Sequence, residues 1–81
     1  MLEQINQPIE VAAHFGLHQV RPLKFVWRGR EYRVQKVNLT WSRWEGRTKF
    51  YYFAVSDNAN YYKLQFNSES LAWTLLESYV E

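Results

Sequence analysis

An alternation of apolar and polar residues on both sides of a glycine constrains the fold of this chain more than any other feature. The stretch Leu23–Trp41 reads LKFVWRGREYRVQKVNLTW. Alternation is typical of half-buried strands, and Gly29 supplies the positive φ that a tight turn between two strands requires. The stretch therefore predicts a β-hairpin, with one strand over about Leu23–Trp27 and the next over about Glu31–Arg43.

The longer of these two strands changes phase part-way along. Its early apolar residues fall on even positions and its later ones on odd positions, namely Tyr32 and Val34, then Val37, Leu39 and Trp41. Because successive side chains point to opposite faces of a sheet, one inserted residue would return both sets to the same face. We expect a β-bulge near Gln35-Lys36 and a strong bend of the chain there.

The rest of the chain continues as strands separated by short turns. Further strands are expected at Pro8–Val11, extendable to Phe15, and at Thr48–Ser56, Tyr61–Phe66 and Leu71–Val80. Residues 9–17 and 71–80 also have the apolar spacing of a helix, and Ser70 is a suitable cap for the second. We favour a strand at both places, and we expect residues 1–7 to fray.

These elements predict one all-β domain over residues 1–81. We expect an antiparallel meander of five to six strands, curled into a small half-barrel that resembles SH3-like architecture, with a helix as the alternative for the last element. Aromatic residues make up 19% of the chain, so a few large rings can build its core. A flat sheet would leave one aromatic face in water, which favours curling.

Catalytic, metal-binding and membrane-spanning signatures are missing from the sequence. There is no cysteine, no glycine-rich or nucleophile motif, and no long apolar run. His14 and His18 are four residues apart but have no third ligand nearby. The start of the chain lacks the pattern of a signal peptide. We therefore expect a cytoplasmic protein that is not an enzyme and binds no cofactor or metal.

The positive charge is concentrated in the middle of the chain. Residues 21–49 hold nine Lys or Arg against two Glu, or 9 − 2 = +7, whereas the rest holds 1 − 6 = −5. This segregation indicates a positive surface region. The alternative is that Lys and Arg keep the hairpin surfaces soluble and protect sheet edges from pairing.

Alternation assigns most side chains to one of two faces. The inward residues are expected to be Leu23, Phe25, Trp27, Tyr32, Val34, Val37, Leu39, Trp41, Phe50, Tyr52, Tyr62, Leu64 and Phe66. The opposite face then combines cations with rings: Lys24, Arg33, Lys36, Lys49, Tyr51, Phe53, Tyr61 and Lys63. Cations neutralise phosphates and exposed rings stack on bases. Packing of Tyr51 and Phe53 under the first or last element is the alternative.

The two hairpin tips add four candidate nucleic-acid-binding residues. Arg28 and Arg30 flank the first tip, where guanidinium groups can hold a phosphate or carboxylate with two hydrogen bonds. Arg43 and Trp44 lie at the second tip, where an exposed ring beside a cation suits a base or a protein partner.

Three segments resemble a small bacterial all-β domain family of unknown function. They are Pro8–Val11 (PIEV), Pro22–Trp41 (PLKFVWRGREYRVQKVNLTW) and the ending YYKLQFNSESLAWTLLESYVE. The family pattern is PIEV, then P-x-x-F-x-W-R-G-R-x-Y-x-V, then an aromatic hairpin that closes on W-x-L. Such domains occur alone or near the C-termini of Y-family DNA-polymerase-like proteins of mutagenic repair. The resemblance implies an all-β ending and a partner in DNA repair complexes, with no known activity.

The sequence therefore predicts a non-catalytic module that binds single-stranded or distorted DNA. The resemblance implies that it is accessory to DNA repair or translesion synthesis. One alternative is a protein-interaction adaptor that docks a partner on an aromatic sheet face or edge. Another is a homodimer that buries the aromatic strand at Thr48–Ser56. The oligomeric state stays open.

Overall fold

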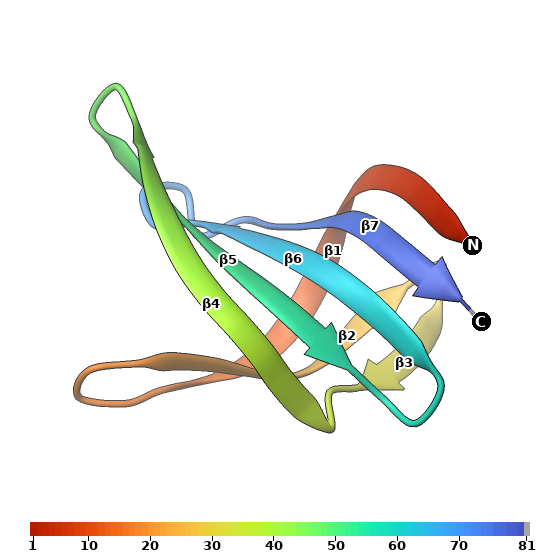
Figure 1. The fold of residues 1–81 in the computed structure, drawn as a ribbon. Helices are drawn as coiled ribbons and strands as arrows, with labels where there is room; N and C mark the ends of the chain where they lie inside the picture. The colour runs from red at the N-terminus through yellow and green to blue at the C-terminus, as the bar shows by residue number, and fades with distance from the viewer. Residues whose placement is uncertain (81) are drawn as a thin grey trace.

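Seven antiparallel strands form one sheet, and no helix occurs among the residues that the computed structural model describes, 1–80. The strands are β1 (Leu2–Phe15), β2 (Val20–Trp27), β3 (Arg30–Arg33), β4 (Lys36–Glu45), β5 (Thr48–Ser56), β6 (Asn60–Asn67) and β7 (Trp73–Val80). Their order across the sheet is β3-β2-β1-β7-β6-β5-β4 (Figure 1).

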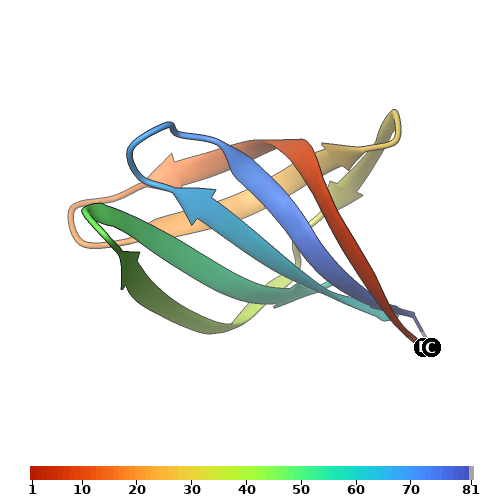
Figure 2. The same cartoon turned by 90° about the horizontal axis from the view of Figure 1, so that it is seen from above.

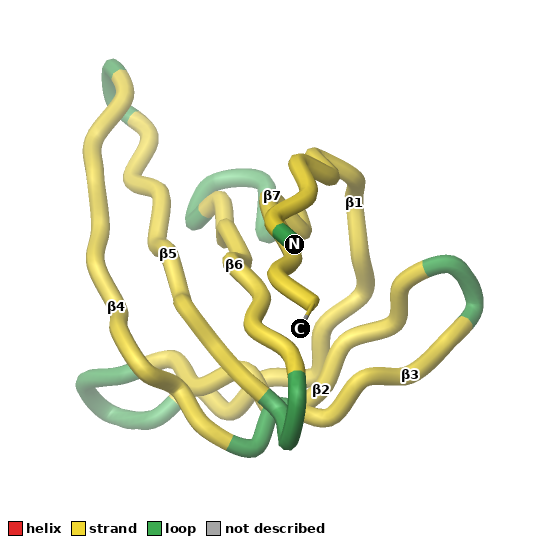
Figure 3. The backbone as a smooth tube through the Cα atoms, turned by 45° about the vertical axis from the view of Figure 1, so that its right-hand side comes forward, coloured by secondary structure: helices red, strands yellow, loops and turns green. Residues whose placement is uncertain are grey.

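The first strand is shared between the two halves of the sheet. Residues 2–9 of β1 pair with β7, and residues 10–15 pair with β2. The register against β7 shifts between Gln4 and Gln7, where Asn6 has a φ of 52°, a conformation that asparagine tolerates well. The sheet curls so that β4 and β5 face β2 and β3 across the interior (Figures 2 and 3).

A corner joins the two edges of this sheet without closing it into a barrel. The chain passes from β3 to β4 through Val34 and Gln35. The Val34 amide donates to the Leu23 carbonyl (2.9 Å), and the Gln35 amide donates to the Ser56 carbonyl (3.0 Å). Successive residues thus bond to β2 and to β5, which ties the two edges together at the bend.

The expected all-β curled meander is confirmed, and so is the hairpin at Gly29, whose φ is +73°. The first and last elements are strands, as favoured over helices. The number of strands is seven rather than five to six. The expected frayed start is wrong, because β1 begins at Leu2. The strand expected over Glu31–Arg43 is divided at the corner, and its register against β5 shifts between Val37 and Leu39.

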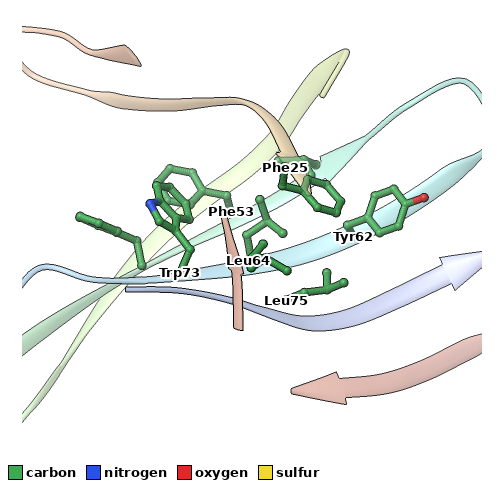
Figure 4. Packing of buried hydrophobic residues seen from close by; sticks show 9 residues of the cluster. Phe25, Phe53, Tyr62, Leu64, Trp73 and Leu75 are labelled. Atoms are coloured by element: carbon green, nitrogen blue, oxygen red, sulfur yellow. The ribbon is translucent and has the colours of Figure 1, made fainter. Parts of the chain in front are cut away.

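Nine buried side chains on the inner face form the core (Figure 4): Ile9, Phe25, Phe53, Val55, Tyr62, Leu64, Phe66, Trp73 and Leu75. Rings dominate the contacts: the Phe66 and Trp73 centroids are 4.7 Å apart, and the Phe25 and Tyr62 centroids 5.2 Å. Leu64 and Leu75 have no exposed surface. A short curled sheet is thus filled by a few large side chains from five of its strands.

Several positions expected to point inward do not. Leu39 is 61% exposed and Leu23 is 46% exposed. Each lies at a shift of register, where an extra residue turns the following side chains to the other face. Trp41 consequently stacks on Tyr52 outside the core, with centroids 5.3 Å apart.

The side chains of β5 expected to point inward, Phe50 and Tyr52, point outward instead. Phe53 is 3% exposed and belongs to the core, and Tyr51 packs against that core. Phe50 and Tyr52 alternate with them and fall on the outer face. Both the odd and the even positions of β5 are apolar. The sequence of the strand therefore does not tell which set of side chains points into the core. The expected inward positions of Tyr62, Leu64 and Phe66 in β6 are confirmed.

Replacing Leu64 with alanine should lower the free energy of unfolding by about 2–5 kcal/mol, because the side chain leaves a cavity in the core. The matched variant Leu39→Ala should change it by less than about 0.5 kcal/mol, since that side chain is already exposed. Urea denaturation followed by circular dichroism measures both. Equal losses for the two variants would contradict the assignment of faces.

The buried Tyr62 ring predicts a loss of stability in alkali. Burial raises the pKa of the Tyr62 hydroxyl above its ordinary value. Stability from the neutral hydroxyl is fully present below about pH 10, the unfolded pKa, and is lost as the pH rises through the folded pKa. Absorbance titration of tyrosinate should show a late step that Tyr62→Phe removes and Tyr61→Phe keeps. A late step that survives Tyr62→Phe would contradict this.

Candidate nucleic-acid interface

The structure separates the predicted binding residues into six places. Lys24 and Arg33 are opposite each other on the outer face of β2 and β3, and Arg28 and Arg30 flank the turn between those strands. Lys36 begins β4. The remaining residues lie on the β4–β5 hairpin (Arg43, Trp44, Lys49 and Tyr51), on the outer face of β6 (Tyr61 and Lys63) and in the core (Phe53). The expected single face is therefore wrong, and Phe53 is hidden.

The β4–β5 hairpin brings together two rings and a cation on its inner side. Trp44 and Lys49 are opposite each other in the ladder. The Lys49 ammonium lies 5.7 Å from the centre of the Trp44 ring and 5.0 Å from that of Tyr51. Trp44 is 65% exposed, whereas Tyr51 is half-buried and leans toward Phe66. We name Trp44, Lys49 and Tyr51 the tip cluster.

Local structure holds the tip cluster in place. Gly46 has a φ of +61° in the turn, and the space around its α-carbon is open, so the backbone conformation alone favours glycine. The Lys49 carbonyl accepts hydrogen bonds from the Ser68 hydroxyl (2.7 Å) and the Ser68 amide (3.2 Å). The hairpin is thus tied to the β6–β7 turn at Lys49, while the turn at Gly46 projects beyond this point (Figure 1).

A second group of rings and cations lies on the outer side of the same hairpin. The stacked Trp41 and Tyr52 rings are nearly parallel, with an angle of 9° between them. The Arg43 guanidinium is 5.4 Å from the Tyr52 ring, and the Lys63 ammonium is 5.8 Å from the Trp41 ring. Lys63 also pairs with Glu77 at 3.3 Å. The carboxylate offsets part of the positive charge here, so this side is a weaker site for a polyanion.

The pairing of cations with rings is thus concentrated on this hairpin. Within residues 1–80, four of the six such pairs involve residues of this hairpin, and the other two are Arg28 over Trp27 at 4.5 Å and Arg30 over Tyr32 at 5.5 Å. Sequence reasoning identified Arg43, Trp44, Lys49 and Tyr51 but placed Trp41 and Tyr52 inside. The phase change in the sequence predicted a bulge near Gln35-Lys36, whereas the register shift that turns Trp41 outward lies between Val37 and Leu39. Tyr52 is outward because of the phase of β5.

An apolar groove opens beside the tip cluster. It has a volume of about 610 Å³ and is lined by residues of the β1–β2 loop, β5 and the β6–β7 turn. Phe15, Leu17 and Leu71 on its rim are 58%, 96% and 67% exposed. Large exposed apolar side chains gathered in one place are typical of an interaction surface.

Features of other functional classes are not found in residues 1–80. No group of three or more His, Cys, Asp or Glu side chains there could hold a metal ion. Nor does this part of the chain contain a helix long and apolar enough to cross a membrane.

Comparison with known proteins identifies a family for this chain. The family model with the description "Domain of unknown function (DUF6504)" matches residues 1–78, which include the first six strands and most of the seventh. No curated protein and no solved structure matches the chain.

The tip cluster predicts how anions reach Trp44. Iodide should quench tryptophan fluorescence in the protein efficiently, because Lys49 attracts anions to the most exposed of the four indoles. In Lys49→Gln the quenching constant for iodide should fall by about twofold at low salt, since one nearby charge is lost. The neutral quencher acrylamide is the control and should show no change. An equal fall for both quenchers would indicate a change of structure instead.

Proposed function

The chain belongs to this family of domains of unknown function, whose model spans all but its last three residues, and we propose that it is a non-catalytic module that binds single-stranded nucleic acid. The site of the proposal is the β4–β5 hairpin. The tip cluster is its centre, with Arg47 in the turn and Arg43 on the outer side as further cations.

One observation carries this proposal: an ammonium group lies between two rings at the end of a projecting hairpin. Stacking of a base on an aromatic ring contributes about 1–3 kcal/mol and tolerates any sequence. Lys49 is in position to neutralise a phosphate between two bases stacked on Trp44 and Tyr51. Bases in a duplex are already stacked and paired, so this arrangement favours a single strand or a distorted site.

The charge of the hairpin favours nucleic acid over an apolar protein partner. Residues 36–49 hold four Lys or Arg and one Glu, or 4 − 1 = +3. An adaptor surface would be expected to present rings without cations at its centre, because charged residues are depleted there. Here a cation lies against each ring of the tip cluster.

A role beside mutagenic-repair polymerases in the bacterial cytoplasm is part of the same proposal. Its support is the resemblance of Pro8–Val11 and of the pattern from Phe25 to Val34 to domains near the C-termini of Y-family-like proteins. A domain that holds single-stranded template next to such a polymerase would need contacts that are independent of sequence. Stacking and phosphate contacts are of that kind.

Fluorescence anisotropy with labelled oligothymidine of about 15 nucleotides tests the proposal. Binding should weaken as salt rises, with a slope of log K against log salt of about −2, since about three cations contact phosphates. A duplex of the same length should bind more weakly. Absent binding at low salt, or binding that salt does not change, would dismiss the proposal.

Variants of the tip cluster locate the site. Trp44→Ala should weaken binding about tenfold, because one stacking surface is lost. Lys49→Gln should weaken binding and should make the slope of log K against log salt less steep by about 0.7, because one phosphate contact is lost. Lys36→Gln and Leu17→Ala are matched controls, at the far end of β4 and on the β1–β2 loop, and should bind as the unchanged protein does. A larger effect of Lys36→Gln than of Lys49→Gln would place the site elsewhere.

The apolar groove supports a second candidate function, self-association of two copies through Phe15, Leu17 and Leu71. Sedimentation velocity at increasing protein concentration distinguishes the two candidates. If the groove is the interface, a dimer forms and Leu17→Asp abolishes it. A monomer at every concentration would remove this candidate and leave the first untouched.

A further inference from the structure

One edge of the sheet is long and open. β4 has ten residues, most of them exposed, and β5 is its one neighbour in the strand order (Figure 3). The opposite edge strand, β3, has only four residues. Proteins often protect a long edge with a proline or a bulge. β4 contains no proline, and its register shift lies near its start, between Val37 and Leu39. The edge is therefore regular over residues 39–45.

The backbone of β4 directs every second amide and carbonyl to this open edge. The Lys49 carbonyl accepts from Ser68, on the side of β5 away from β4, so Lys49 and the opposite residue Trp44 form a pair without hydrogen bonds between them. Such pairs alternate with hydrogen-bonded pairs along an antiparallel ladder. The amides and carbonyls of Trp44, Ser42 and Thr40 therefore point away from β5. All three residues are exposed.

The side chains beside this edge are apolar and cationic. Leu39 is 61% exposed, and Arg43 is exposed on the same outer face of β4. Neither Arg43 nor Lys36 forms an ion pair within residues 1–80. With Arg47 and Lys49 in the hairpin, residues 36–49 carry the net charge of +3 given above. Charge complementarity therefore favours an acidic occupant of the edge.

We propose that β4 accepts an extended, acidic segment of another protein as an eighth strand of the sheet. In strand addition, main-chain hydrogen bonds give the affinity, and alternate side chains give the specificity. Carboxylates of the added strand would lie near Arg43, and its apolar side chains would cover Leu39. The edge binds through its main chain, whereas the tip cluster binds through side chains. This inference therefore does not depend on the function proposed above.

Two other occupants match the edge less well. A second copy of the chain, paired through its own β4, would bring another net charge of +3 to the interface, and like charges on adjacent strands are destabilising. A DNA backbone offers acceptors to the amides of Thr40, Ser42 and Trp44 but no donors to their carbonyls. An extended polypeptide offers both at the spacing of the strand.

Amide hydrogen exchange of the full chain, measured by NMR with an acetylated peptide of four Glu-Val repeats, tests the proposal. The amides of Thr40, Ser42 and Trp44 should exchange rapidly in the free protein and about fivefold or more slowly when the peptide is bound. Those of Trp41 and Arg43, which point to β5, should be protected in both states. The dissociation constant should be at or below about 1 mM. Unchanged exchange at the three outward amides would overturn the proposal.

A matched pair of variants tests the role of the main chain. Ser42→Pro removes an amide that points to the open edge, so it breaks no hydrogen bond to β5 but should weaken peptide binding about tenfold. Ser42→Ala removes the same hydroxyl, keeps the amide and should bind as the unchanged protein does. Preserved chemical shifts of core amides show that each variant is folded. Equal affinity in the two folded variants would overturn the proposal.

Charge variants test the choice of an acidic occupant and do not require the proline variant to fold. Arg43→Gln should weaken peptide binding about threefold at low salt, because one cation beside the edge is lost. Arg33→Gln removes the same charge from β3, at the other edge, and should leave the affinity unchanged. A peptide of four Lys-Val repeats should bind at least about tenfold more weakly than the Glu-Val peptide. Equal binding of the two peptides would overturn the proposal.

The same exchange measurement distinguishes the other occupants. Protection of the three outward amides that grows with protein concentration alone would indicate pairing of two copies and would overturn the assignment to an acidic segment. Protection by oligothymidine but not by the Glu-Val peptide would overturn it as well. Peptide binding in a protein that does not bind oligothymidine would support this inference and dismiss the nucleic-acid function, so the two can fail separately.

Discussion

Burial of large rings on the inside of a curled sheet is the interaction on which the rest of this structure depends. A domain of this size buries a smaller share of its surface than larger domains do. Each core side chain therefore contributes a large part of the total stabilisation from apolar burial. Phe53, Phe66 and Trp73 form one end of the core, and Phe25 with Tyr62 the other. Neither half of the sheet covers these rings alone, so the curl is a condition of stability.

The most exposed ring of the proposed site, Trp44, lies outside the core. Trp44 and Trp27 each make a cation–π contact, with Lys49 and Arg28 respectively. The cation covers part of a ring face that solvent would otherwise contact. Such contacts contribute little to stability at exposed sites and are easily exchanged for contacts with a ligand. Core rings and surface rings therefore have different roles, although both come from the same aromatic-rich strands.

Local sequence was sufficient for features that depend on neighbouring residues. The Gly29 turn and the strands beside it follow from short patterns. The cation expected beside Trp44 was Arg43, but Arg43 lies over Tyr52 and Lys49 lies over Trp44. The phase of β5 did not follow from a short pattern, because Phe50–Val55 is apolar at every position and the choice depends on β4 and β6. The pairing of Leu2 with Tyr79 joins residues at opposite ends of the chain, and no pattern within either segment reveals it.

The pairing of β1 with β7 has a consequence for folding during synthesis. When residues 1–34 have left the ribosome, β2 can already pair with β3 and with the second half of β1, but the first half of β1 has no partner. Its partner β7 is made after the other six strands, and contacts between such distant segments are slow to form. Until then Ile9 and Phe25 lack their cover from Leu64 and Leu75. The nascent chain therefore exposes apolar surface until β7 has emerged, and such surface favours aggregation or binding by chaperones.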